Sequence, residues 1–422
     1  MNKFMKWLEE SFAPRLQKIT NLIWIVVIKD SLLQILPFIL AGSIFCCLAI
    51  LNDYFPSLPS FWTPFGWTMS KISLMVAFLI PFNYCEKKRF RKQRIIAGIT
   101  GLMLFMICVE PEIIADNQAG TFGQGHDAYG AGGMFVAILA GIVAGLIFGA
   151  FAKFSFFKED SAIPDFVRQW FDALLPICLT ICLGWIAVDI LHFDIYNTVV
   201  AALSPLQSFA NTWYGMTIIL FLYCFIYSMG ISTWVLTPVC EPVKLAGIAT
   251  NLSLVAAGTA TVANLSIFTE TFIYTCYLWI GGVGATLSLV LLMCFAAKSR
   301  ELKALGRACL IPGILNINEP VVFGAIAWNP LLMIPMWLQG IVLPLLTWLF
   351  TKVIPLAPIP RIQFELWYCP YPISTFISTQ GSVMGVLFAV ATFFVSGLIW
   401  FPFFKAYDAQ KVRDEQAALK KA

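Results

Sequence analysis

The sequence predicts an all-α, polytopic membrane protein with about 10 transmembrane helices and two re-entrant hairpins in its C-terminal half. Of the 422 residues, 59% are apolar and 12% are charged, whereas about 25% are charged in a typical soluble domain. The charges form short blocks and leave uncharged stretches at residues 31–52, 128–152, 195–240, 271–297, 320–351 and 366–404. A spanning helix needs about 20 apolar residues, and these stretches are apolar all round rather than on one helical face.

The first half of the chain has a regular order of predicted spans. They lie near residues 32–51, 66–84, 95–115, 132–152 and 173–191. A charged connection with a proline occupies residues 158–168, between the fourth and fifth spans.

The second half is less regular. Its predicted spans lie near residues 214–230, 271–297, 330–351 and 383–404. Between them, the segments 231–268 and 306–329 are rich in Gly, Asn and Pro. Backbone that leaves the helix at membrane depth must be buried in protein or line a wet cavity, because lipid cannot bond its polar groups. Both segments are therefore expected to be re-entrant hairpins, of the kind that holds substrate in transporters.

Basic residues beside the spans predict the orientation. One loop, Lys87 to Arg94, and a second cluster, Lys298 to Arg307, are dense in Lys and Arg. By the positive-inside rule these segments face the cytoplasm, together with the N-terminal residues, which are expected to form an amphipathic surface helix, and the basic tail. Keeping both clusters on one side requires an extra crossing between Gly230 and Thr271. The net charge of +4 is too small to indicate a nucleic-acid partner.

Small residues and cysteines carry weaker signals. Gly141, Gly145 and Gly149 form a stripe at four-residue spacing, which suits close helix packing; it fits a dimer interface and packing inside one bundle equally well. The 12 cysteines lie mostly singly in apolar spans. Their spacing predicts neither a metal site nor a disulfide framework.

The sharpest local pattern is Asn318-Glu319-Pro320 in apolar surroundings. An ionisable group at membrane depth is costly and usually lines a substrate or ion path. Pro320 interrupts the helix and leaves backbone carbonyls and the Asn318 amide available to a ligand. A sugar suits such a pocket, because its hydroxyls donate to a carboxylate. The alternative is that Glu319 caps or ion-pairs the hairpin.

With these residues the chain resembles the membrane subunit, component IIC, of the bacterial phosphotransferase system, in its lactose, cellobiose and diacetylchitobiose group. The resemblance runs through Gly281 to Thr286, Lys298 to Lys303 and Pro312 to Pro320, and then through Asn329, Pro330 and Pro335. Weaker similarity covers nearly the whole chain.

The resemblance implies a sugar permease in the bacterial cell (inner) membrane with both termini cytoplasmic. It would be a homodimer in which residues 1–157 form the interface domain, 158–172 a cytoplasmic connection and 173–422 the transport domain. A disaccharide is translocated and phosphorylated by a IIB subunit, and IIA and IIB are expected on separate chains. Enzyme status stays open, because no phosphate-carrying residue is predicted here, and no cofactor or metal is expected.

The resemblance also assigns site residues. The acid of the Asn-Glu-Pro motif binds sugar, which carries substrate binding to Asn318 and Glu319 and makes Glu319 the predicted catalytic residue. Trp367, ahead of a proline-containing segment, matches a tryptophan that stacks on sugar. Tyr227 stands where the family has another tryptophan and is expected to supply a stacking face.

One departure concerns a histidine. Where the family usually has Gly-Ile-His-Gly, this chain has Gly230-Ile231-Ser232-Thr233, so Ser232 takes the place of a histidine that shares the sugar with the glutamate. Serine cannot act as a base near neutral pH. Either Glu319 alone suffices for a differently shaped sugar, or the chain is a non-phosphorylating facilitator or sugar sensor. Glu241 and Lys244 could compensate, although an ion pair between them is the favoured interpretation.

Overall fold

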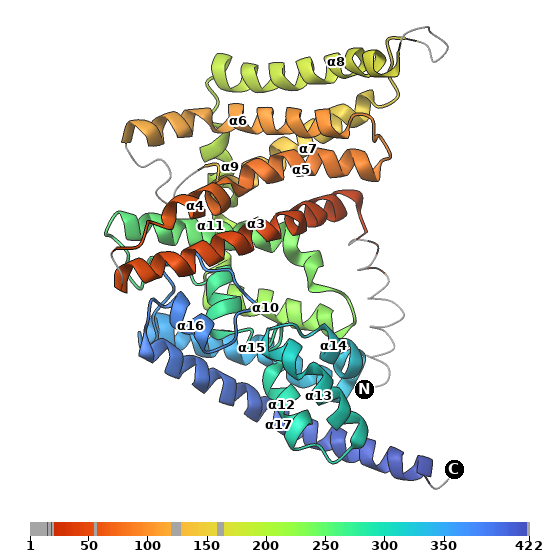
Figure 1. Cartoon of the computed structure of the whole chain (residues 1–422), viewed down its shortest axis with the longest axis vertical. Helices are drawn as coiled ribbons and strands as arrows, with labels where there is room; N and C mark the ends of the chain where they lie inside the picture. The colour runs from red at the N-terminus through yellow and green to blue at the C-terminus, as the bar shows by residue number, and fades with distance from the viewer. Residues whose placement is uncertain are drawn as a thin grey trace.

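The computed structural model describes residues 15, 18, 21–54, 57–119, 128–157 and 164–419. Most of the expected N-terminal surface helix lies outside these residues, as does His126, one of the two histidines in the chain. Every regular element within the described ranges is helical (Figure 1). The first group of helices comprises α3 (Ile23–Tyr54), α4 (Trp62–Thr68), η2 (Met69–Lys71), α5 (Ile72–Lys87), α6 (Arg94–Ala119), η3 (Ala131–Gly133), α7 (Met134–Phe151), α8 (Asp165–Trp185), η4 (Ile186–Ile190) and α9 (Ile195–Ala210).

The second group carries more breaks and shorter helices. Its elements are α10 (Trp213–Ser228), η5 (Thr233–Leu236), α11 (Thr237–Ala256), η6 (Thr271–Tyr277), α12 (Leu287–Phe295), α13 (Arg300–Ile314), α14 (Glu319–Val321), η7 (Val322–Ile326), α15 (Pro330–Trp348), η8 (Leu349–Val353), α16 (Ile373–Ser378) and α17 (Val383–Leu419). At a rise of about 1.5 Å per residue, α17 is about 55 Å long and exceeds the hydrocarbon core of about 30 Å.

Apolar side chains gather in two large cores. One contains buried residues of α3, α5, α6 and α7, and the other contains residues of α10, η6, α12, α15 and α17. Figure 1 shows the two groups stacked along the long axis of the molecule. Leu245 and Ala249 of α11 belong to the first core, so this helix connects the two.

Helix α8 packs against α6 and α7 at one end of the molecule (Figure 1). Its other face exposes large apolar side chains, among them Trp170 and Leu174. The helix follows the charged connection in sequence, yet in space it belongs to the first group.

The glycine stripe of α7 packs within its own bundle. A Cβ on Gly141 would lie 2.8 Å from the Cβ of Ile80, and one on Gly149 would lie 2.9 Å from the Tyr84 ring. Such contacts leave no room for a side chain, so the stripe allows α5 to approach α7 closely. Of the two uses considered for the stripe, the structure shows intrabundle packing.

Seven helices in the described ranges are long and apolar enough to cross a membrane, and up to eight if the bent pair α9 and α10, which meet at 84°, is one span. The predicted spans in the first half, and those near 330–351 and 383–404, coincide with helices. The prediction of one span at 271–297 is wrong, because η6 ends at Tyr277 and residues 278–286 separate it from α12. This segment, called the glycine loop below, contains Gly281, Gly282 and Gly284, which all have positive φ. The total of about 10 spans stays a prediction.

The two segments expected to be hairpins differ. Most of 231–268 is the 20-residue helix α11, which together with η5 is long and apolar enough to cross a membrane. It can therefore supply the extra crossing that the charge pattern requires. The segment 306–329 is interrupted between α13 and α14, where Asn316 takes a φ of +59°. The re-entrant character of both segments stays a prediction.

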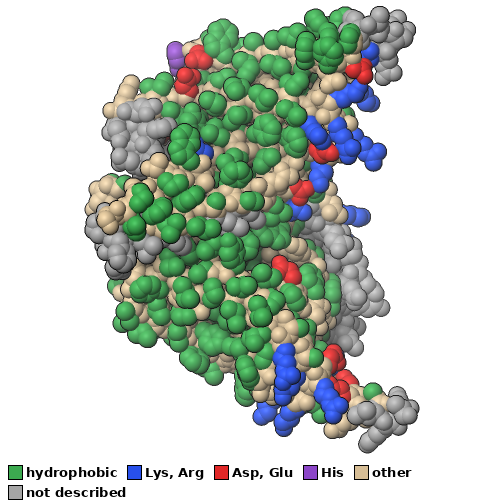
Figure 2. All heavy atoms as spheres, viewed as in Figure 1, with side chains coloured by type: hydrophobic (Ala, Val, Ile, Leu, Met, Phe, Trp, Pro, Cys, Tyr) green, Lys and Arg blue, Asp and Glu red, His purple; other side chains and the backbone are tan. Residues whose placement is uncertain are grey.

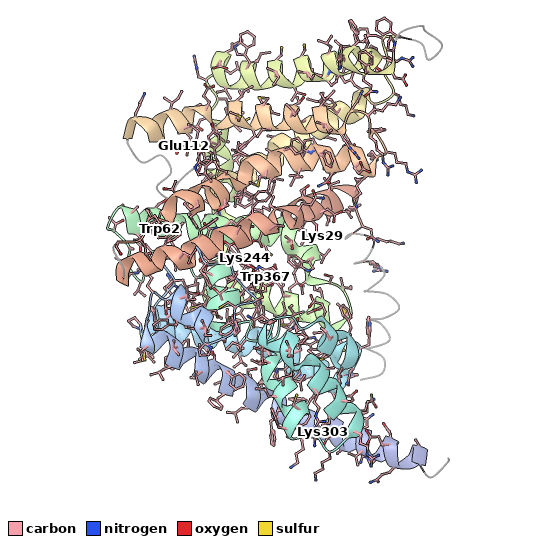
Figure 3. All side chains as sticks on the ribbon, viewed as in Figure 1. Lys29, Trp62, Glu112, Lys244, Lys303 and Trp367 are labelled. Atoms are coloured by element: carbon pink, nitrogen blue, oxygen red, sulfur yellow. The ribbon has the colours of Figure 1, made fainter. Side chains whose placement is uncertain are left out.

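Charged side chains are distributed unevenly over the surface. Figure 2 shows the visible Lys and Arg side chains gathered mostly along one edge of the molecule. Figure 3 places Lys29 and Lys303 toward this edge and Glu112 toward the opposite one, with Lys244 and Trp367 between them. Lys244 and Trp367 therefore lie in the interior, between these two edges of the molecule.

Candidate functional site

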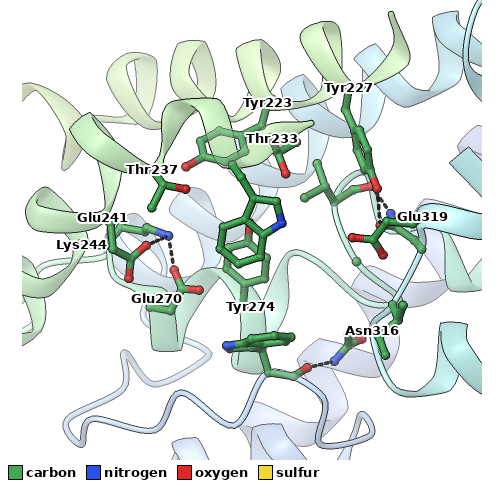
Figure 4. A pocket seen from close by; sticks show the side chains of 16 residues that line it. Tyr223, Tyr227, Thr233, Thr237, Glu241, Lys244, Glu270, Tyr274, Asn316 and Glu319 are labelled. Carbon is green, nitrogen blue, oxygen red and sulfur yellow. Dashed lines mark hydrogen bonds and ion pairs between the residues drawn. The ribbon is translucent and has the colours of Figure 1, made fainter. Parts of the chain in front are cut away.

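A cavity of about 280 Å³ lies between the second-group helices, at the depth of Lys244 and Trp367 (Figure 4). Helices α10 and α11, the 3-10 turn η5, the π-helix η6, the glycine loop and the Asn-Glu-Pro segment contribute its walls. Ligand pockets usually measure about 300–1,000 Å³, with mostly apolar and aromatic walls and a few polar groups. The lining here has the same character, because it combines polar side chains with aromatic ones, namely those of Tyr223, Tyr227, Trp234, Tyr274 and Trp367.

Glu319 is the first residue of α14 and is exposed toward the cavity that it lines. Among the described residues, no side chain or backbone donor bonds with its carboxylate. The alternative of a structural ion pair therefore finds no partner in the described part of the chain. An ionised carboxylate accepts hydrogen bonds only, so Glu319 is available to the hydroxyl groups of a ligand.

Asn318 is buried, with 4% of its surface exposed. Its Nδ2 donates to the carbonyl oxygen of Val283 at 2.8 Å, and its Oδ1 accepts from the hydroxyl of Tyr227 at 3.4 Å. These bonds join the Asn-Glu-Pro segment to the glycine loop and to α10. Asn318 lines the cavity, but its amide already bonds within the protein, and its contact with substrate stays a prediction.

Tyr227 and Trp367 also line the cavity. The Tyr227 ring meets Phe323 edge to face, with centroids 5.8 Å apart, and only 3% of the residue is exposed. Trp367 is half-buried and is anchored through its backbone, because its carbonyl accepts from Nδ2 of Asn316. Trp367 therefore offers the more accessible ring.

Asn316 connects three segments around the cavity. Its Oδ1 accepts from the backbone N–H of Gly281 at 2.7 Å, and its Nδ2 donates to the carbonyls of Trp367 and Cys369. Asn tolerates the left-handed conformation better than most residues. Sequence reasoning did not single out Asn316, although its place two residues before Asn318 was a signal.

Ser232 is exposed at the N-terminal end of η5 and is not among the lining residues, whereas its neighbours Thr233 and Trp234 are. Its binding role stays a prediction. Among the described residues no histidine lines the cavity, and His192 is exposed between η4 and α9.

A charged cluster on the other side of the cavity adds a residue that the sequence analysis missed. Lys244 pairs with Glu241 at 2.7 Å, which confirms the expected ion pair. Lys244 also bonds with Glu270. Glu270 directly precedes an uncharged stretch, and the membrane-depth argument that singled out Glu319 could have found it.

Comparison with known proteins gives one consistent family. Residues 29–340 match the family model described as phosphotransferase system, EIIC. The cellobiose-specific EIIC component of Geobacillus stearothermophilus is 28% identical, with 99% of this chain and 97% of that protein covered. The lactose-specific EIICB component of Staphylococcus epidermidis is 28% identical, with 98% and 72% covered.

A solved structure agrees in fold. The transporter ChbC, the IIC component from the N,N'-diacetylchitobiose-specific phosphotransferase system, superimposes with a TM-score of 0.84 at 26% identity, and the match covers 97% of this chain and 99% of that one. The helical architecture and the family match agree over most of the chain. This multi-pass membrane protein belongs to the EIIC family of the phosphotransferase system and is a sugar permease component.

Proposed function

We propose that this permease carries a disaccharide of the cellobiose, lactose or chitobiose type and presents it for phosphorylation by a IIB subunit on a separate chain. The observation that carries the proposal is the Glu319 carboxylate, which lines a cavity of disaccharide scale and has no bonding partner among the described residues. The names of the relatives support the sugar class.

Each residue then has a distinct task. Glu319 accepts hydrogen bonds from sugar hydroxyls, and the Trp367 ring supplies an apolar face on which a sugar ring stacks. Asn318 and Tyr227 hold the Glu319 segment against the glycine loop through the bonds between them. In this proposal the phosphate comes from the IIB subunit, and the residues of the cavity hold the sugar.

The proposal extends to assembly and orientation. IIA acts with IIB on further chains, and the permease works as a homodimer in a bacterial cell membrane with cytoplasmic termini. Residues 1–157 form the interface domain and 173–422 the transport domain. Helix α8 is the exception to these bounds: most of it lies within 173–422, but it packs on α6 and α7 and so belongs with the interface domain. The gathering of Lys and Arg along one edge supports the orientation.

Uptake measurements test the proposal. Cells that express the chain with IIA and IIB subunits are expected to accumulate labelled cellobiose as the phosphorylated sugar, and a Glu319→Gln variant is expected to lose this uptake while it still inserts in the membrane. A matched variant, Glu110→Gln, changes an exposed carboxylate of α6 away from the cavity and serves as the control. Native uptake by the Glu319→Gln variant would contradict the assignment.

A second candidate function rests on the missing histidine. No described histidine lines the cavity, so the described part of the site has no imidazole to act as a base near neutral pH. A facilitator or sugar sensor needs no such base. Accumulation of unphosphorylated sugar in cells without IIA and IIB would favour a facilitator, and binding without uptake would favour a sensor.

A further inference from the structure

The cluster of Glu241, Lys244 and Glu270 lies across the cavity from Glu319 (Figure 4). Lys244 is 3% exposed and Glu270 is 8% exposed, so both charges are nearly removed from solvent. Tyr274 lies between the two sides, and its ring centroid is 5.1 Å from the Lys244 ammonium. The cavity thus has two polar sides with aromatic side chains between them.

The cluster holds more negative than positive charge. One ammonium serves two carboxylates, and each uses its Oε2 for that bond. Within the described part of the chain, no donor bonds with Oε1 of Glu241 or of Glu270. Among the described lining residues, the carboxylates are Glu241, Glu270 and Glu319, and the cation is Lys244.

A purely structural ion pair does not account for this arrangement. Glu241 and Lys244 are one helical turn apart on α11 and satisfy each other in charge. The addition of a buried Glu270 leaves a second carboxylate without a full partner, and a buried charge is costly unless it is paired and hydrogen-bonded. The open oxygens and the unbalanced charge both call for a donor with a positive charge.

We propose that this cluster binds a protonated amine of the substrate, so that the permease prefers a disaccharide of amino sugars with free amino groups. The inference rests on the proposed function and specifies its substrate class. An ammonium donates to the Oε1 atoms of Glu241 and Glu270 and balances the second carboxylate, whereas a neutral hydroxyl supplies only the hydrogen bond. Lys244 shows that the same two carboxylates and the Tyr274 ring already hold an ammonium.

Binding to the purified full chain in detergent tests the inference. The ligands are cellobiose, the β-1,4-linked disaccharide of glucosamine, and glucosamine alone, titrated calorimetrically at about pH 6, where aliphatic amines are protonated. The amino disaccharide is expected to bind about tenfold or more tightly than cellobiose, because charge-assisted hydrogen bonds exceed neutral ones. A Glu270→Gln variant is expected to remove this preference, so that the two disaccharides bind with similar affinity.

Two further arms separate the possible failures. The Glu110→Gln variant is expected to bind as the native chain does, and thermal unfolding shows whether the Glu270→Gln variant is folded; if it is not, Glu241→Gln replaces it. Equal or weaker binding of the amino disaccharide, with cellobiose bound normally, overturns the inference alone. If neither disaccharide binds, the proposed function fails. If glucosamine alone then binds and this binding is lost in Glu270→Gln, the amine-binding role of the cluster is still supported. If no ligand binds, both the proposed function and the amine-binding role are overturned.

Discussion

Asn318 donates a hydrogen bond of 2.8 Å to the carbonyl oxygen of Val283, directly beside a glycine that makes the approach possible. Gly282 takes a φ of +94°, and a Cβ built on it would lie 2.5 Å from Cγ of Asn318. The glycine loop and the Asn-Glu-Pro segment therefore fit together only while residue 282 lacks a side chain.

The first prediction concerns Gly282→Ala. The added methyl group pushes Asn318 away and moves Glu319, the next residue, so the affinity for sugar is expected to fall about tenfold, a loss of about 1.4 kcal/mol. Titration of the purified variant with sugar measures it. Gly258→Ala is the matched control, because Gly258 has a φ of +68° and nothing within 4 Å of its Cβ position. Affinity unchanged in both variants would show that the contact is not needed.

The second prediction concerns Asn316→Ala. The change leaves the Gly281 amide and the Trp367 carbonyl without their bonds to Asn316, and buried polar groups left unpaired cost about 1–3 kcal/mol each. We expect a lower thermal midpoint and weaker sugar binding, because Trp367 loses its anchor.

Asn329→Ala separates these effects. Asn329 caps α15 by accepting from the amide of Leu331, and loss of such a cap costs about 1 kcal/mol. This control is expected to lower the thermal midpoint alone. If Asn316→Ala likewise left sugar binding intact, Asn316 would be a stabilising residue with no part in the site.

The third prediction concerns Lys352→Ala. Lys352 donates to the carbonyls of Val262, Ala263 and Leu265, and so holds the segment that leads to Glu270. Without these bonds the segment is expected to open more often. Faster hydrogen exchange over residues 257–268, compared with native exchange in α7, is the expected result, and equal exchange in the two proteins would refute it.

The span at 132–152 and the cavity residues show what could be predicted. Residues 132–152 are uniformly apolar and nearly coincide with α7, Met134–Phe151. Glu319, Asn318, Trp367 and Tyr227 come from distant parts of the sequence and line one cavity. A charge in an apolar segment is conspicuous in the sequence, which is why Glu319 was found.

The division of 271–297 could not be predicted from hydropathy. The whole stretch is uncharged, yet Gly281, Gly282 and Gly284 adopt φ values of +86°, +94° and +84° and end the helical path. Hydropathy measures transfer into lipid and does not report backbone conformation. Glu270 was missed because it stands directly before that stretch, outside the uncharged residues that predict a span.

The last prediction is a double-mutant cycle at Lys244 and Glu270. Lys244→Met removes the cation that pairs with Glu241 and Glu270. Breaking a buried ion pair from one side costs about 3–5 kcal/mol, since the partner charge stays buried. The double variant Lys244→Met, Glu270→Gln leaves one carboxylate fewer unpaired and is expected to be more stable than Lys244→Met alone. Thermal unfolding in detergent compares the four proteins. Strictly additive shifts in midpoint would mean that Lys244 and Glu270 do not interact, because residues that share one ion-pair network give non-additive shifts.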